Sequence, residues 1–96
     1  MEKIRTTVRI AGKDYTLSGY DSEEYVRRVA SYVDRKITEL ELATRLPSQQ
    51  LAVLTSVSIA DDLLKAHDEN ARLRKELSQT REELERLRAR FQAQAE

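Results

Sequence analysis

The strongest constraint on the fold is the second half of the chain, where neither proline nor glycine interrupts the stretch from Ser48 to Glu96. An unbroken helix over this stretch would be roughly 70 Å long at 1.5 Å per residue. That length is several times the radius of a small domain, so the far end of the helix must leave the globular part. We therefore expect a small compact part from which a long helix continues.

The first half of this helix is apolar around most of its circumference. Between Leu51 and Leu64 only Thr55, two serines and the pair Asp61-Asp62 are polar. A helix of this kind must be covered on more than one side. The short segment that precedes it is too small to do so, and a second copy of the chain is the simplest cover. The pattern predicts an obligate dimer.

From Leu63 onward the apolar residues narrow to the seam of a heptad repeat, with seven of nine a and d positions apolar. With Leu63 at a, the a positions hold Leu63, Asn70, Leu77, Leu84 and Phe91, and the d positions hold Ala66, Leu73, Thr80 and Leu87.

The flanking charges predict the orientation of the paired helices. The g positions are glutamate (Glu69, Glu76, Glu83), and the e positions five residues later are arginine (Arg74, Arg81, Arg88). In a parallel pair each g residue faces the following e residue of the partner, so unlike charges meet. An antiparallel pair would bring like charges together, which is unfavourable. Asn70 at an a position also fits a parallel two-stranded register.

The first half of the chain predicts a hairpin and a shorter helix. Residues 3–18 alternate between apolar and polar, with Ala11-Gly12-Lys13-Asp14 as the turn. Asp21 is the expected cap of a helix with one apolar face that runs to about residue 43. Pro47 then ends this helix, because it forces Leu46 out of the helical conformation.

The predicted fold is α+β: a small N-terminal β-hairpin and a helix pack on the start of a long C-terminal helix, which continues as a coiled coil. Residues 1–64 form a dimerising globular head, and residues 65–96 form the coiled coil. The residues expected to carry oligomerisation are Leu54, Val57, Leu63, Asn70, Leu73, Leu77, Leu84, Leu87 and Phe91.

Composition excludes several classes of protein. The 17 basic and 17 acidic residues balance, and residues 1–47 carry nine basic and eight acidic side chains, so neither half has the excess of a nucleic-acid or anionic-membrane binder. The absence of cysteine excludes disulfides, thiolate zinc sites and thiol nucleophiles. No apolar run has the length of a signal peptide or a membrane span, so we expect a cytoplasmic protein.

Candidates for catalysis, cofactors or metals are weak. His67 is the sole histidine, and its neighbours Asp68 and Glu69 do not share its helix face, so no metal site is expected. Asp61 and Asp62 point about 100° apart on a helix, which does not suit paired acid–base work. No phosphate loop or nucleophile motif is present. We expect a protein that is not an enzyme and needs no cofactor.

Two other non-enzymatic classes are compatible with the pattern. A strand with Arg5, Thr7 and Arg9 on one face, in a helical dimer, suggests a β-ribbon DNA-binding protein. The balanced charge and the turn back at Gly12 argue against it. A generic coiled-coil adaptor is the other alternative.

Five motifs follow one another along the chain: V-x-I-x-G-x-x-Y-x-L-x-G (8–19), DSEEYV (21–26), VAxxVDxK (29–36), LAVLT (51–55) and IADDL (59–63). Together and in this order they resemble the ZapA family of FtsZ-associated cell-division proteins, with the first motif similar to the family's N-terminal hairpin. The chain departs from the family pattern at Ser58, where asparagine is common. The match covers nearly the whole chain.

The resemblance implies a bacterial protein of the mid-cell division ring that binds FtsZ polymers, cross-links and bundles protofilaments, and opposes their disassembly. The implied assembly is a homodimer, with a homotetramer formed as a dimer of dimers also open. The implied FtsZ-binding surface is the charged face of the head, including an arginine between the two helices. In this chain that arginine corresponds to Arg45. Four nearby charges on or beside the outward side of the first helix complete the candidate FtsZ-binding set: Arg35, Lys36, Glu39 and Glu41.

Overall fold

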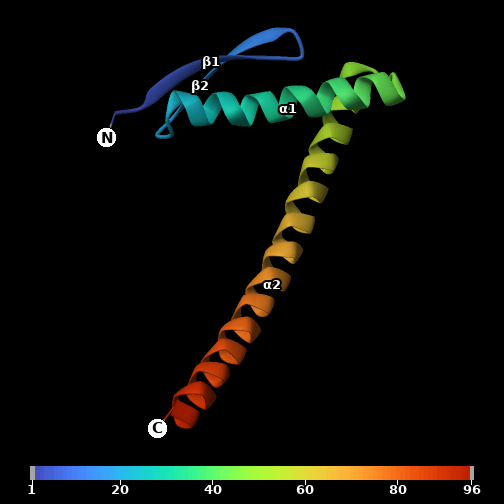
Figure 1. Ribbon diagram of the computed structural model, residues 1–96. Helices are drawn as coiled ribbons and strands as arrows, with labels where there is room; N and C mark the ends of the chain where they lie inside the picture. The colour runs from blue at the N-terminus through green and yellow to red at the C-terminus, as the bar shows by residue number, and fades with distance from the viewer. Residues whose placement is uncertain (1, 96) are drawn as a thin grey trace. The chain divides into compact units, whose positions relative to one another are not determined.

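The computed structural model describes residues 2–95. Two strands precede two helices, in the order β1 (Ile4–Ile10), β2 (Lys13–Gly19), α1 (Glu23–Thr44) and α2 (Ser48–Ala95) (Figure 1). The predicted α+β fold, with a hairpin and a shorter helix before a long one, is therefore confirmed. The chain forms two compact units, the first ending at Asp61 and the second beginning at Asp62, and α2 contributes residues to both.

The hairpin is antiparallel and closes through two residues, Ala11 and Gly12, which both have positive φ (54° and 78°). A two-residue hairpin turn that matches the right-handed twist of the strands requires positive φ at both of its residues. The predicted four-residue turn is too long, because Lys13 already pairs with Ile10 and Asp14 with Arg9.

The hairpin is stabilised by packing of β1 against α1, and Figure 1 shows the hairpin lying along this helix. Thr6 and Val8 on the inner face of β1 are buried, as is Ala30 on α1. The absence of a large side chain at Ala30 allows the strand and helix to approach closely. A two-stranded sheet is marginal alone, so this packing is what keeps the hairpin folded.

α1 begins at Glu23, one residue later than a helix capped by Asp21 would begin. Ser22, with extended backbone (φ −64°, ψ 154°), is the N-cap, and its hydroxyl accepts a hydrogen bond from the Tyr25 N–H at 3.1 Å. The prediction that Asp21 caps the helix is therefore wrong. Glu24 is consequently the second helical residue rather than the third, so it cannot close a capping box with its cap. It contributes instead, with Glu23, negative charge at the positive end of the helix.

The break between the helices follows the prediction. α1 ends at Thr44, and Arg45 adopts the left-handed conformation (φ 53°, ψ 33°) with its N–H donating to the Glu41 carbonyl at 2.9 Å. The Pro47 carbonyl accepts a hydrogen bond from the Leu51 N–H, which opens α2. α2 then runs for 48 residues without a break. No helix within residues 2–95 has the length and apolar character needed to span a membrane.

Two buried polar side chains in the first unit lack partners. Thr6 on β1 and Thr55 on α2 are almost fully inaccessible, and neither hydroxyl has a hydrogen-bond partner among the described residues.

Candidate partner-binding surfaces

The start of α2 is buried on one side and open on the other. Leu51 and Thr55, four residues apart, are buried within the first unit. Val53 and Val57 remain about 60% exposed, and Leu54 is half-buried. Because one face of this apolar segment is covered within the chain and another is not, the exposed face is a candidate for contact with a partner.

An apolar groove of about 400 Å³ lies beside this segment, within the first unit. Its walls come from the hairpin, α1 and the start of α2. Tyr15 and Leu17 of β2, whose cross-strand neighbours Val8 and Thr6 are buried, remain partly exposed along it. The inner face of the sheet is thus covered over β1 and open over β2. The groove lining comprises Ile10, Ala11, Lys13, Tyr15, Leu17, Ile37, Glu41, Ser48, Leu51 and Ala52.

The second unit exposes the whole predicted coiled-coil seam. A single chain buries none of it, and Phe91 is 74% exposed. Repeated exposed leucines at a and d spacing on one helix are typical of a face that packs against another helix. The seam residues predicted for oligomerisation that are exposed here are Leu63, Asn70, Leu73, Leu77, Leu84, Leu87 and Phe91.

The charged side chains predicted to contact FtsZ lie in two groups. The first group follows α1, where Arg35 forms an ion pair with Glu39 at 3.9 Å. The Arg35 guanidinium carbon and the Lys36 ammonium lie 5.2 and 5.9 Å from the centre of the Tyr32 ring, within cation–π range. Two cations therefore lie over one aromatic ring, and one of them also pairs with a carboxylate.

The second group surrounds the corner between α1 and α2. Arg45 and Glu41 line a hollow of about 440 Å³ there, together with Leu46 and Pro47. The left-handed backbone at Arg45 costs a non-glycine residue about 1 kcal/mol, so this arginine occupies a position that glycine would fill more easily. The structure does not bring this group into the same hollow as Arg35, Lys36 and Glu39.

Leu42 is a candidate residue at the corner that the sequence pattern did not single out. It is 77% exposed, the most exposed of the large apolar side chains described, and it lines the same hollow as Arg45. Arginine is enriched among the residues that contribute most to protein-binding interfaces, and the exposed leucine adds apolar surface beside it. The signal in the sequence is its position off the apolar face of α1, two residues after Leu40.

A charge cluster on α2 shifts the pKa values of two of its members. Hydrogen bonds from the Arg72 guanidinium lower the pKa of Glu69 below its ordinary value, and the bond with Glu69 raises the pKa of Arg72. Within residues 2–95, the charge cluster included, no three acidic, histidine or cysteine side chains gather in a way that could hold a metal ion. His67 is exposed on α2.

Comparison with known proteins identifies close relatives. The family model described as "Cell division protein ZapA" matches residues 6–91. The cell division protein ZapA of Halalkalibacterium halodurans is 48% identical over 68 residues, covering 70% of this chain and 75% of that protein. The protein of the same name from Geobacillus kaustophilus is 43% identical over 81 residues, covering 83% and 89%.

A solved structure is similar over most of the chain. It is described as a ZapA mutant dimer from Geobacillus stearothermophilus, with a TM-score of 0.63 and 43% sequence identity. The similarity covers 81% of this chain and 92% of that chain.

Proposed function

The chain belongs to the ZapA family of cell division proteins, and from this membership we propose that it binds FtsZ polymers at the mid-cell division ring in the cytoplasm. There it cross-links protofilaments into bundles and opposes their disassembly. The match over residues 6–91 carries this proposal, because it includes the hairpin, α1 and nearly all of α2. The role requires no catalysis and no cofactor.

Cross-linking requires at least two FtsZ-binding surfaces in one particle, and self-association supplies them. The proposed arrangement is a homodimer in which residues 1–64 form a dimerising head and residues 65–96 form a parallel coiled coil, with a tetramer of two dimers as a further level. The exposed seam leucines and the open face at Val53 and Val57 support this arrangement, as does the dimeric state of a solved relative.

Bivalency explains how a small protein can hold filaments together. Once one surface is bound, the second binds at a high effective concentration along the polymer, so modest affinities combine into tight attachment. A protein that binds polymer more tightly than free subunits also shifts the assembly equilibrium toward polymer. Any change in GTP hydrolysis by FtsZ would then be an indirect result of slower disassembly.

The FtsZ-contacting surface that we propose is centred on Arg45 and Glu41 at the corner, and Arg35, Lys36 and Glu39 on α1 extend it. The exposed Leu42 beside Arg45 gives the corner an apolar contact as well as charge. Arg45 supports the proposal most directly. Its side chain is exposed, and its backbone adopts a strained left-handed conformation in which glycine would be more stable.

The test is GTP-dependent co-sedimentation and light scattering of purified FtsZ with the wild-type chain, Arg45→Glu and Arg28→Glu. Arg28 is an exposed arginine on α1 outside both groups, so it controls for charge reversal. We expect wild type and Arg28→Glu to pellet with polymer and raise scattering, and Arg45→Glu to lose most of both effects while it remains a dimer by sedimentation.

Two results would contradict the proposal at different levels. Equal bundling by Arg45→Glu would remove the corner as the contact surface but leave FtsZ as the partner. A folded wild-type dimer that stays in the supernatant would remove FtsZ bundling itself, and the coiled-coil adaptor and DNA-binding alternatives would need testing, the latter by retention on DNA at low salt.

A further inference from the structure

Arg72 forms a bridge between two glutamates on the same helix. Its Nε donates to Glu69 Oε2 at 3.0 Å, its Nη2 contacts Glu69 Oε1, and its Nη1 donates to Glu76 Oε1 at 2.6 Å. The guanidinium therefore holds the carboxylates three residues before it and four residues after it. All three side chains are about half exposed, so the bridge lies on the surface of α2 rather than within a core.

The two bridged glutamates occupy predicted g positions, directly beside the seam. In a parallel pair of these helices, Glu69 would face Arg74 of a second copy, and Glu76 would face Arg81. Within residues 2–95 of one chain, the side chains of Arg74 and Arg81 make no hydrogen bond and no ion pair. The carboxylates are thus already held, while the arginines that would meet them are unengaged.

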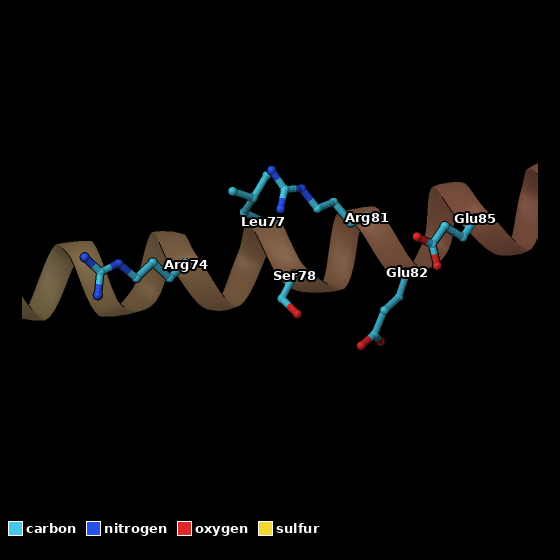
Figure 2. A pocket seen from close by; sticks show the side chains of 6 residues that line it. All are labelled: Arg74, Leu77, Ser78, Arg81, Glu82 and Glu85. Carbon is cyan, nitrogen blue, oxygen red and sulfur yellow. The ribbon is translucent and has the colours of Figure 1, made fainter.

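The surroundings of these arginines agree with a role at the seam. Figure 2 shows Leu77 and Arg81 extending to the same side of α2, whereas Ser78 and Glu82 project from another side. Leu77 is a seam residue and is half exposed. Arg81 consequently lies along the edge of the face that would pack against a second helix.

We propose that Arg72 is a positioning residue for self-association, which holds the Glu69 and Glu76 carboxylates where each can accept a second arginine from another copy of the chain. This inference rests on the self-association in the proposed function. Isolated surface ion pairs contribute little, partly because two long side chains must lose their freedom when they meet. Because the bridge already restricts the glutamate side chains in the single chain, they lose little further conformational freedom when the helices associate. This is the general basis of preorganisation.

The chain supplies a matched control at Arg86. It occupies the same heptad position as Arg72 two heptads later, and it also follows a g glutamate, Glu83, by three residues. Four residues after Arg86 stands Arg90 rather than a glutamate, so no bridge between two successive g-position carboxylates can form there. Substitution of Arg86 therefore removes the same charge without removing a bridge of this kind.

The experiment measures the dimer dissociation constant of the full chain by analytical ultracentrifugation for wild type, Arg72→Met, Arg72→Lys and Arg86→Met. Methionine and lysine have nearly the helix propensity of arginine, and circular dichroism at high concentration checks that each variant folds. At low salt we expect Arg72→Met to weaken the dimer about tenfold and Arg86→Met less than about twofold. Arg72→Lys should recover only part of the loss, because an ammonium lacks the planar fork that holds two carboxylates.

A second set of variants separates positioning from a simple effect of charge. In a chain that carries Glu69→Gln and Glu76→Gln, Arg72→Met should change the dissociation constant no further. The effect of Arg72→Met in the wild-type background should also shrink when salt rises from about 0.05 M to about 0.5 M.

The possible failures are distinguishable. If Arg72→Met weakens the dimer no more than Arg86→Met, the positioning role is wrong and the proposed dimer stands. If Arg72→Met tightens the dimer, Arg72 competes with the second copy for the glutamates, which also overturns the role. A wild-type chain that stays monomeric at all concentrations would remove the self-association on which both proposals depend.

Discussion

The backbone N–H of Ala11 donates a hydrogen bond to Asp34 Oδ1 at 2.9 Å, which ties the hairpin turn to the middle of α1 across 23 residues of sequence. The acceptor is a carboxylate, and hydrogen bonds to charged groups are among the stronger ones. The turn therefore has a fixed attachment point in addition to the packing of β1 on the helix. The bond thus adds to the packing that joins the hairpin to α1.

Substitution of Asp34 should loosen the hairpin. We expect Asp34→Ala to lower the free energy of unfolding by about 1–3 kcal/mol, because the Ala11 N–H loses a charged acceptor. Asp34→Asn should lose less, since its amide oxygen can still accept. Chemical denaturation monitored by circular dichroism would measure both. Equal stability of Asp34→Ala and wild type would show that the bond contributes nothing in solution.

The positive φ at Ala11 offers a stabilising substitution. Asparagine tolerates this backbone conformation better than alanine, and Asn-Gly is the favoured pair for this turn. Ala11→Asn should therefore raise the free energy of unfolding by roughly 0.5–1 kcal/mol, and Ala11→Val should lower it because a β-branched residue fits this conformation poorly. A thermal melt of the three proteins at one concentration gives the order. An order in which valine exceeds asparagine would refute this account of the turn.

Arg45→Gly should separate stability from function. Glycine adopts the left-handed cap conformation without strain, so we expect the variant to be more stable than wild type by about 1 kcal/mol. The same change deletes the exposed guanidinium at the proposed FtsZ-contacting corner, so bundling measured by light scattering should fall. A variant that is both more stable and fully active would indicate that the arginine side chain makes no contact with FtsZ.

Asn70→Leu should stabilise the coiled coil and make its oligomeric state less specific. A buried asparagine at an a position costs stability but restricts helices to a two-stranded register. We expect the variant to melt at a higher temperature and to sediment as a mixture that includes species larger than the wild-type assembly. A variant that is more stable and strictly dimeric would mean that other residues set the oligomeric state.

The Glu69–Arg72 contact predicts how the coiled-coil segment responds to acid. The pKa of Glu69 is lowered from 4.5 in the folded chain, so the folded state binds this proton less readily than the unfolded state does. The resulting stabilisation is complete above the unfolded pKa and is lost as the pH falls through the lower, folded pKa. Melting temperatures of wild type and Arg72→Met, measured from about pH 7 to about pH 3, should therefore converge in acid. A difference that widens in acid would contradict the assignment.

The long-range organisation of the fold was predictable because it depends on a few strong local signals. Pro47 fixes the break between the helices, the absence of glycine and proline after it fixes the length of α2, and the alternation of residues 4–10 fixes β1. The cap of α1 was assigned to Asp21 instead of Ser22 because both residues are good caps and stand side by side. The pattern alone cannot say which of them takes the extended conformation.

The details of the candidate surfaces were less accessible to sequence reasoning. The seam leucines follow from their heptad spacing, whereas Leu42 stands alone off the apolar face of α1, where a single leucine belongs to no repeating pattern. The Arg72 bridge does not follow from the sequence pattern either. Arg72 could pair with several glutamates at helical spacing, and the choice depends on side-chain rotamers rather than on residue type.

The two buried threonine hydroxyls at Thr6 and Thr55 have a consequence for how this protein could change over time. Each one is buried away from water without a hydrogen-bond partner within residues 2–95, which is a cost that a valine of similar shape would avoid. Substitutions that stabilise the fold are therefore available at these two buried positions. The stability they add would offset the stability lost through damaging changes elsewhere, with no exposed residue altered. The outward surfaces are thereby freer to vary, and a chain of 96 residues retains room to adapt to a different partner.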